Sequence, residues 1–128
     1  MPVGPAARPD PRTRLVDICL TLPEAQASSN QHVRFHVRNK TFGYYLDDHH
    51  GDGRIALCCK VPTGDLDPLV ALDPERYFVP PYLGSRGWIG VRLDVRLDVH
   101  DVEWDEIAKF VRVSYGLVAP KRLAELAR

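Results

Sequence analysis

Three predicted strands follow one another between residues 33 and 61, with no helical segment between them. In the first segment the apolar residues fall on one face of a strand and the basic and imidazole residues on the other: Val33, Phe35 and Val37 against Arg34, His36 and Arg38. Strands joined by short loops pair antiparallel, because a parallel pair needs a crossover of a dozen or more residues. The chain is therefore expected to build an antiparallel sheet.

The second and third strands of this sheet are predicted over residues 41–46 and 54–61. A tight turn at Asn39-Lys40 leads into the second strand, whose large apolar residues are expected to share one face: Phe42, Tyr44 and Leu46. The polar loop Asp47–Gly53 separates the two strands. Together the three strands predict a meander.

Helical periodicity appears before and after the meander. Asp10-Pro11 has the pattern of an N-cap followed by proline at the first helical position, and the apolar spacing that follows predicts a helix ending before Pro23. Asp67-Pro68 repeats this pattern and predicts a short helix through Leu72. A longer helical stripe begins after Asp101, and Pro120 separates it from a short terminal helix.

Two further strands are predicted between these helices. Residues 77–79 form a short one that ends at Pro80-Pro81, because proline has no N–H for a sheet ladder. Residues 89–99 alternate over a long strand with charged side chains outward. The order α-β-β-β-α-β-β-α-α predicts an α+β fold, with an antiparallel five-stranded sheet and helices packed against one face. Residues 10–128 are expected to form this single domain, and residues 1–9 a disordered N-terminal tail.

Composition limits the function classes that the chain fits. Among 128 residues, 17 Lys and Arg balance 17 Asp and Glu, so binding to a polyanion would need a local basic patch. The three cysteines match no zinc-ligand spacing, which is typical of reduced thiols and predicts a cytoplasmic protein. No apolar run has the length of a membrane span, so no membrane partner is expected.

Catalysis and metal binding have little support in the sequence. The loop at residues 47–53 gathers carboxylates and imidazoles that resemble metal ligands: Asp47, Asp48, His49, His50 and Asp52. Its spacing matches no calcium loop, and a solvated hairpin loop has the same composition. Neither a nucleophile elbow nor a glycine-rich phosphate loop is present. We therefore expect no enzyme activity, no cofactor and no metal site, although a metal in this loop stays open.

The segment Tyr82–Trp88 is the best candidate for an interaction site. Trp88 is expected to cover the core at the start of a strand, the alternative being an exposed stacking platform. Arg86, in a glycine-flanked turn, is expected to face solvent.

Several segments together resemble the MmcQ/YjbR-like family, a group of small bacterial proteins. They cover most of residues 14–126: LPE at Leu22–Glu24, VRFHVRNKTFGYY at Val33–Tyr45, IALCCK ending at Lys60, DPERYFVPPYLGSRGWIGVRLD at Asp73–Asp94, and SYGLVAPKRL at Ser114–Leu123. The resemblance implies a double-wing or secretion-chaperone-like fold and a DNA-binding role that rests largely on fold comparison. By motif position, the resemblance also implies that Lys60, Tyr82, Arg86 and Trp88 are candidate binding residues.

Two functions follow from these observations. The first is weak, salt-dependent DNA binding through a local basic patch, with the candidate residues Arg34, Arg38, Lys40, Lys60, Tyr82, Arg86 and Trp88. Residues 31–60 hold five basic and three acidic side chains, which supports such a patch, although an acidic tip at residues 47–52 would repel phosphates. The second is an adaptor that binds another protein or a small ligand without catalysis. The sequence does not predict an oligomeric state.

Overall fold

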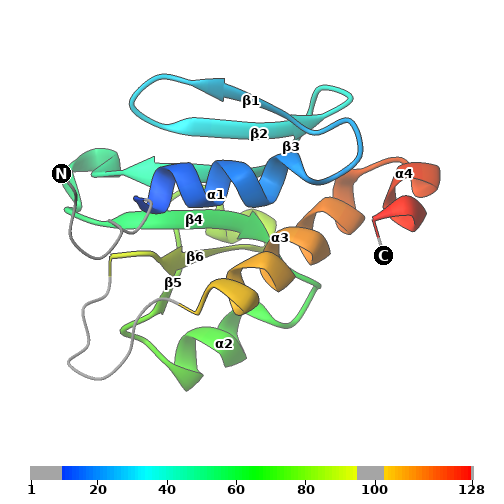
Figure 1. Ribbon diagram of the computed structural model, residues 1–128. Helices are drawn as coiled ribbons and strands as arrows, with labels where there is room; N and C mark the ends of the chain where they lie inside the picture. The colour runs from blue at the N-terminus through cyan, green and yellow to red at the C-terminus, as the bar shows by residue number, and fades with distance from the viewer. Residues whose placement is uncertain (1–9, 95–102, 128) are drawn as a thin grey trace, which may run out of the picture.

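A single antiparallel sheet forms the centre of the computed structural model, which describes residues 10–94 and 103–127 (Figure 1). Its six strands are β1 Gln26–Ser29, β2 Val33–Val37, β3 Lys40–Asp47, β4 Ile55–Lys60, β5 Tyr77–Phe78 and β6 Trp88–Arg92. They lie in the order β1-β2-β3-β4-β6-β5, and each neighbouring pair is antiparallel. The α+β class and the antiparallel sheet predicted from the sequence are thus confirmed.

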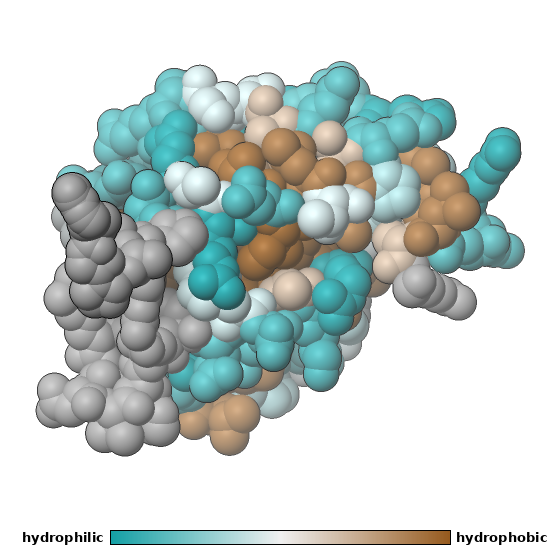
Figure 2. Space-filling model, in the orientation of Figure 1, coloured by the Kyte–Doolittle hydropathy of each residue, from teal (hydrophilic) through white to brown (hydrophobic). Residues whose placement is uncertain are grey.

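The helices cover one face of the sheet, as predicted. Their bounds are α1 Pro11–Leu20, α2 Leu66–Leu72, α3 Trp104–Val118 and α4 Lys121–Leu126, with short 3₁₀ turns η1 His49–Gly51 and η2 Gly84–Arg86. In Figure 1, α1 and α3 cross in front of the sheet, and side chains from all four helices join the main core. Figure 2 looks onto this face and shows hydrophobic residues between hydrophilic borders.

Two capping features set the ends of α1. The carboxylate of Asp10 accepts the backbone N–H of Thr13 at 2.8 Å, which fills one of the unpaired donors at the helix N-terminus. This hydrogen bond lowers the pKa of Asp10. Leu15 and Cys19 bury the inner face of the helix, which ends at Leu20, before Pro23, as expected.

The sheet has one strand more than predicted, because β1 has no hydrophobic signature. Of its residues Gln26 to Ser29, only Ala27 is even partly buried, so no apolar alternation marks the strand. Backbone pairing with β2 defines it instead, with Gln26 opposite His36 and Ser29 opposite Val33. Side-chain periodicity alone misses an edge strand of this kind.

A β-bulge corrects the predicted faces of β3. The pairing between β2 and β3 shifts at Phe35/His36, where Gly43 pairs with Phe35 and Thr41 with His36, so Phe42 is the extra residue. Phe42 and Tyr45 therefore enter the main core under the helices, whereas Tyr44 and Leu46 pack on the opposite face. The expectation that Phe42, Tyr44 and Leu46 share one face was wrong.

The boundaries of two other elements also differ from the predictions. β6 ends at Arg92, whereas the predicted strand continues to Val99, so the observed strand is shorter within the described residues. Leu93, just beyond its end, is buried. The remainder of that prediction, residues 95–99, and the predicted tail at residues 1–9 lie outside the described residues. α2 begins at Leu66, with Asp65 rather than Asp67 at the N-cap.

A second, smaller hydrophobic cluster lies on the sheet face away from the helices. Leu46, Cys58 and Trp88 form it, with Tyr44 and Leu83 packed against them. Cys59, the neighbour of Cys58, belongs to the main core, so the two thiols lie on opposite faces as predicted. All three cysteines are free, and burial raises the pKa of Cys58 to about 12, which makes this thiol a poor nucleophile at neutral pH.

Candidate functional site

Two turns at one end of the sheet flank an open pocket, here called the two-turn pocket. One wall is the end of β4 and the turn after it, Lys60–Gly64, and the other is the segment Gly84–Gly87. Leu66 and Asp67 at the start of α2 complete the lining, and the pocket has a volume of about 510 Å³. Lys60 and Arg86, both singled out from the sequence, thus line the same pocket although 26 positions apart.

The geometry of the second wall depends on glycine. A Cβ on Gly84 would lie 2.3 Å from Cγ1 of Val79, closer than two carbons can approach. Gly87 has φ of +82°, in the left-handed region that other residues avoid. Its carbonyl accepts the N–H of Val61 at 3.1 Å and so joins the two walls. The glycines flanking Arg86 therefore shape the turn that holds this side chain.

Lys60 is positioned by a contact that sequence analysis missed. The Oγ of Ser114, fully buried on α3, accepts the backbone N–H of Lys60 at 2.9 Å and donates to the carbonyl of Phe42 at 2.6 Å. One hydroxyl thus connects α3 to β3 and β4. The sequence offers only one signal for it, a serine on the apolar stripe of the last long helix.

The other residues of the Tyr82–Trp88 segment divide into exposed and buried ones. Arg86 is exposed, as expected, and Tyr82 is 82% exposed with φ of +66°. Trp88 is only 8% exposed, and its ring lies 5.9 Å from that of Tyr44. The indole therefore covers a hydrophobic cluster, as expected, and is not an exposed stacking platform. It offers little surface to a ligand.

The three basic residues of the β2–β3 hairpin do not form one patch. Arg34 donates to the hydroxyl of Thr41 at 2.6 Å and to the carbonyl of Asn39 at 3.2 Å. Arg38 forms a two-point ion pair with Glu24, with distances of 2.5 and 3.0 Å. Each guanidinium thus has two hydrogen bonds within the chain. Lys40 is exposed at the start of β3.

Three of the predicted cations remain without a carboxylate partner within residues 10–94 and 103–127: Lys40, Lys60 and Arg86, here called the cation strip. They lie at the ends of β3 and β4 and in the turn before β6, three neighbouring strands of the sheet. Adjacent strands are ~4.8 Å apart, so the strip spans on the order of 10 Å. The structure thus brings together part of the predicted basic patch and separates Arg34 and Arg38 from it.

The acidic loop uses its carboxylates locally. Asp48 accepts the N–H of Gly53 at 2.7 Å, and Asp52 accepts that of Arg54 at 2.8 Å. In the part of the chain that the structure describes, no three His, Cys, Asp or Glu side chains are grouped as metal ligands. These hydrogen bonds give the two aspartates a structural role in closing the loop.

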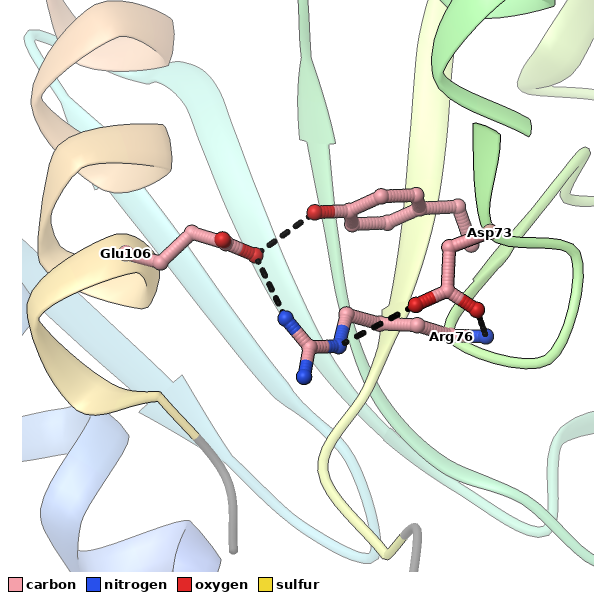
Figure 3. Close-up of polar contacts among 4 residues, drawn as sticks. Asp73, Arg76 and Glu106 are labelled. Atoms are coloured by element: carbon pink, nitrogen blue, oxygen red, sulfur yellow. Dashed lines mark hydrogen bonds and ion pairs between the residues drawn. The ribbon is translucent and has the colours of Figure 1, made fainter. Parts of the chain in front are cut away.

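A polar cluster at the other side of the sheet connects β5 to α3. The hydroxyl of Tyr77 donates to the Oε1 of Glu106 at 2.6 Å, and Arg76 lies between Glu106 and Asp73, at 3.3 and 3.9 Å (Figure 3). Burial, and then the hydrogen bond to Glu106, raise the pKa of Tyr77 to about 12. All charges of the cluster are paired internally, so it has the character of a fold-stabilising contact.

This cluster predicts that the protein loses stability at alkaline pH. The unfolded tyrosine releases its proton near pH 10, whereas folded Tyr77 keeps it to about pH 12, so unfolding is favoured increasingly between these values. One such group contributes at most about 1.4 kcal/mol per pH unit. Urea midpoints measured at pH 8, 10 and 11 should fall, and the fall should be smaller in Tyr77→Phe. Equal slopes in the two proteins would contradict the assignment.

Comparisons with known proteins agree with this architecture. A model of the YjbR family matches residues 20–117, from the end of α1 into α3. The crystal structure of Deinococcus radiodurans protein DR2400, a DUF419 domain, is similar with a TM-score of 0.66 and 20% sequence identity, over 88% of this chain and 84% of that one. No curated protein matches, and none of the helices in the described ranges is long and apolar enough to cross a membrane. The family model covers well over half of the sequence, so the chain belongs to the YjbR family.

Proposed function

We propose that this YjbR-family protein is a non-enzymatic DNA-binding protein that contacts backbone phosphates through the cation strip. The observation that supports the proposal is the position of Lys40, Lys60 and Arg86 at neighbouring strand ends, with no ion pair inside the described chain. A cation in an internal ion pair must break that pair before it binds a phosphate. Within the described residues, Lys40, Lys60 and Arg86 have no such pair to break. Phosphates follow one another every ~3.4 Å of axis along one DNA strand, so the strip can meet two or three of them.

The binding should be weak and without strong sequence preference. The formal net charge is zero, so no long-range field attracts DNA, and Asp67 lines the same pocket as Lys60 and Arg86. Contacts to phosphates set position and carry no sequence information. The acidic loop at residues 47–53 takes no part in this proposal.

The salt dependence of DNA binding tests the proposal. With three phosphates engaged, log K should fall with log[salt] with a slope of roughly −2.7, a loss of about 40-fold between 50 and 200 mM salt. In the double variant Lys60→Glu/Arg86→Glu this slope should shrink by roughly 1.8. Fluorescence anisotropy with a labelled duplex and a labelled single strand measures both.

A matched control is available on α3. Lys109 and Arg112 are exposed on this helix, and Lys109→Glu/Arg112→Glu changes the net charge by the same amount. Affinity should fall much less in this control than in the strip variant. Equal losses in both would show that only net charge matters, and no binding of either DNA at low salt would refute the proposal.

Binding to another protein is the second candidate, supported by two exposed hydrophobic residues before and in the turn. Val79 is 51% and Tyr82 82% exposed, which leaves both side chains accessible to a partner protein. Val79→Ser/Tyr82→Ser should abolish a stoichiometric protein complex and leave DNA affinity unchanged. Loss of DNA binding in this variant would favour the first function.

A further inference from the structure

The two-turn pocket is large enough to hold a molecule rather than a single ion. Its volume of about 510 Å³ falls within the range of ~300–1,000 Å³ that is usual for small-molecule sites. Two cations, Lys60 and Arg86, and one carboxylate, Asp67, line it, which leaves one positive charge in excess. A flat contact with a phosphodiester backbone would not need such a hollow.

Donors for an oxyanion are present besides the two cations. In the described residues, the amides of Thr63 and Gly64 donate no hydrogen bond to the backbone, and the hydroxyl of Thr63 has no partner. Both residues line the pocket together with Ser85, whose Oγ donates to the carbonyl of Tyr82 at 3.0 Å. The pocket thus offers an oxyanion further hydrogen-bond donors besides the two cations.

The walls of the pocket are fixed before any ligand arrives. The bond from Val61 N–H to the carbonyl of Gly87 connects them, and Gly84 packs directly on Val79. The N–H of Trp88 in addition bonds the carbonyl of Leu83 at 3.2 Å, and its ring is buried. A preformed site loses little conformational entropy on binding.

We propose that the two-turn pocket binds a phosphomonoester, with Lys60 and Arg86 as its charge partners. A phosphomonoester carries nearly two negative charges and three acceptor oxygens, which match two cations and the free donors of Thr63 and Gly64. Arginine binds two of these oxygens through its planar fork, and lysine supplies a point charge. The group can come from a small molecule or from a 5′-phosphorylated DNA end, and in the second case the inference rests on the function proposed above.

Titration calorimetry with matched phosphorylated and unphosphorylated ligands tests the pocket. Adenosine 5′-monophosphate is compared with adenosine, and a short DNA strand with a 5′-phosphate with the same strand ending in a 5′-hydroxyl. At least one phosphorylated ligand should bind about tenfold or more tighter than its partner, as charge-assisted hydrogen bonds would give. Lys60→Ala and Arg86→Ala should each remove this difference, and Asp67→Asn should increase the affinity for the phosphorylated ligand. Circular dichroism checks that the variants are folded.

The outcomes separate this inference from the proposed function. Equal binding of the phosphorylated and hydroxyl strands, with no binding of the nucleotide, would overturn the phosphomonoester site and leave DNA binding intact. Binding of the nucleotide alone, without either strand, would support the pocket and refute DNA binding. Weaker binding of the phosphorylated ligand in Asp67→Asn would overturn the assignment, because the carboxylate would then contact the ligand favourably instead of repelling a phosphate in the pocket.

Discussion

Trp88→Ala should lower the free energy of unfolding by about 3–5 kcal/mol, a large fraction of the total for a domain of this size. The indole is 8% exposed and belongs to a small cluster with Leu46 and Cys58, against which Tyr44 and Leu83 pack. Within residues 10–94 and 103–127 no helix packs against this cluster, so few neighbours can move in to fill the cavity that truncation leaves. Urea denaturation followed by circular dichroism measures the loss.

Arg86→Ala is the matched control in the same turn. Its side chain is exposed and makes no ion pair within the described chain, so the urea midpoint should stay near that of the wild type. A wild-type midpoint for Trp88→Ala together with a collapsed midpoint for Arg86→Ala would mean that the two residues have the opposite roles. The two variants therefore distinguish a residue that stabilises the fold from one that is available for binding.

Side-chain periodicity predicted those helices and strands that have one face in the hydrophobic core and the other face polar. β2 has Val33, Phe35 and Val37 buried in the main core and polar residues on its other face, so its alternation is regular. α3 likewise buries Ile107, Val111 and Tyr115 along one stripe. β1 is an edge strand defined by its backbone pairing with β2, and no alternation of apolar residues marks it.

The bulge in β3 shows a different limit of sequence interpretation. One extra residue at Phe42 reverses the faces of all later residues in the strand, so Tyr45 and not Tyr44 reaches the main core. The sequence KTFGYYL is compatible with either register, because aromatic residues occupy both faces. Packing against α3, where the rings of Phe42 and Tyr115 lie 5.4 Å apart, agrees with the observed register.

The candidate site was predictable as a set of residues but not as an arrangement. Lys60, Tyr82 and Arg86 were singled out from sequence, and two of them line one pocket. The ion pair between Arg38 and Glu24 joins the hairpin to the turn after α1, and a charge count along the chain cannot foresee such pairing. The basic patch predicted from composition is therefore smaller in the folded chain, since Arg34 and Arg38 are engaged internally.

Ser114→Ala is expected to destabilise the fold and disturb the site together. The Oγ of Ser114 is the partner of both the Lys60 N–H and the Phe42 carbonyl, in a position with no exposed surface. Each buried group left without a partner costs about 1–3 kcal/mol, so the loss should be about 2–4 kcal/mol although only one oxygen is removed. Ser85→Ala, which removes an exposed hydroxyl bonded to the Tyr82 carbonyl, should cost less than about 1 kcal/mol.

The same substitution tests whether α3 positions the end of β4. Removing the hydroxyl removes the hydrogen bond between the Lys60 N–H and α3. No other side-chain hydrogen bond joins the backbone of Lys60 to this helix in the described chain. The affinity of the folded variant for DNA or a phosphomonoester, measured without urea, should then be lower than that of the wild type. An unchanged urea midpoint would mean that water replaces the hydroxyl between Lys60 and Phe42. An unchanged affinity alongside a lowered midpoint would mean that the bond from Val61 to Gly87 holds the pocket by itself.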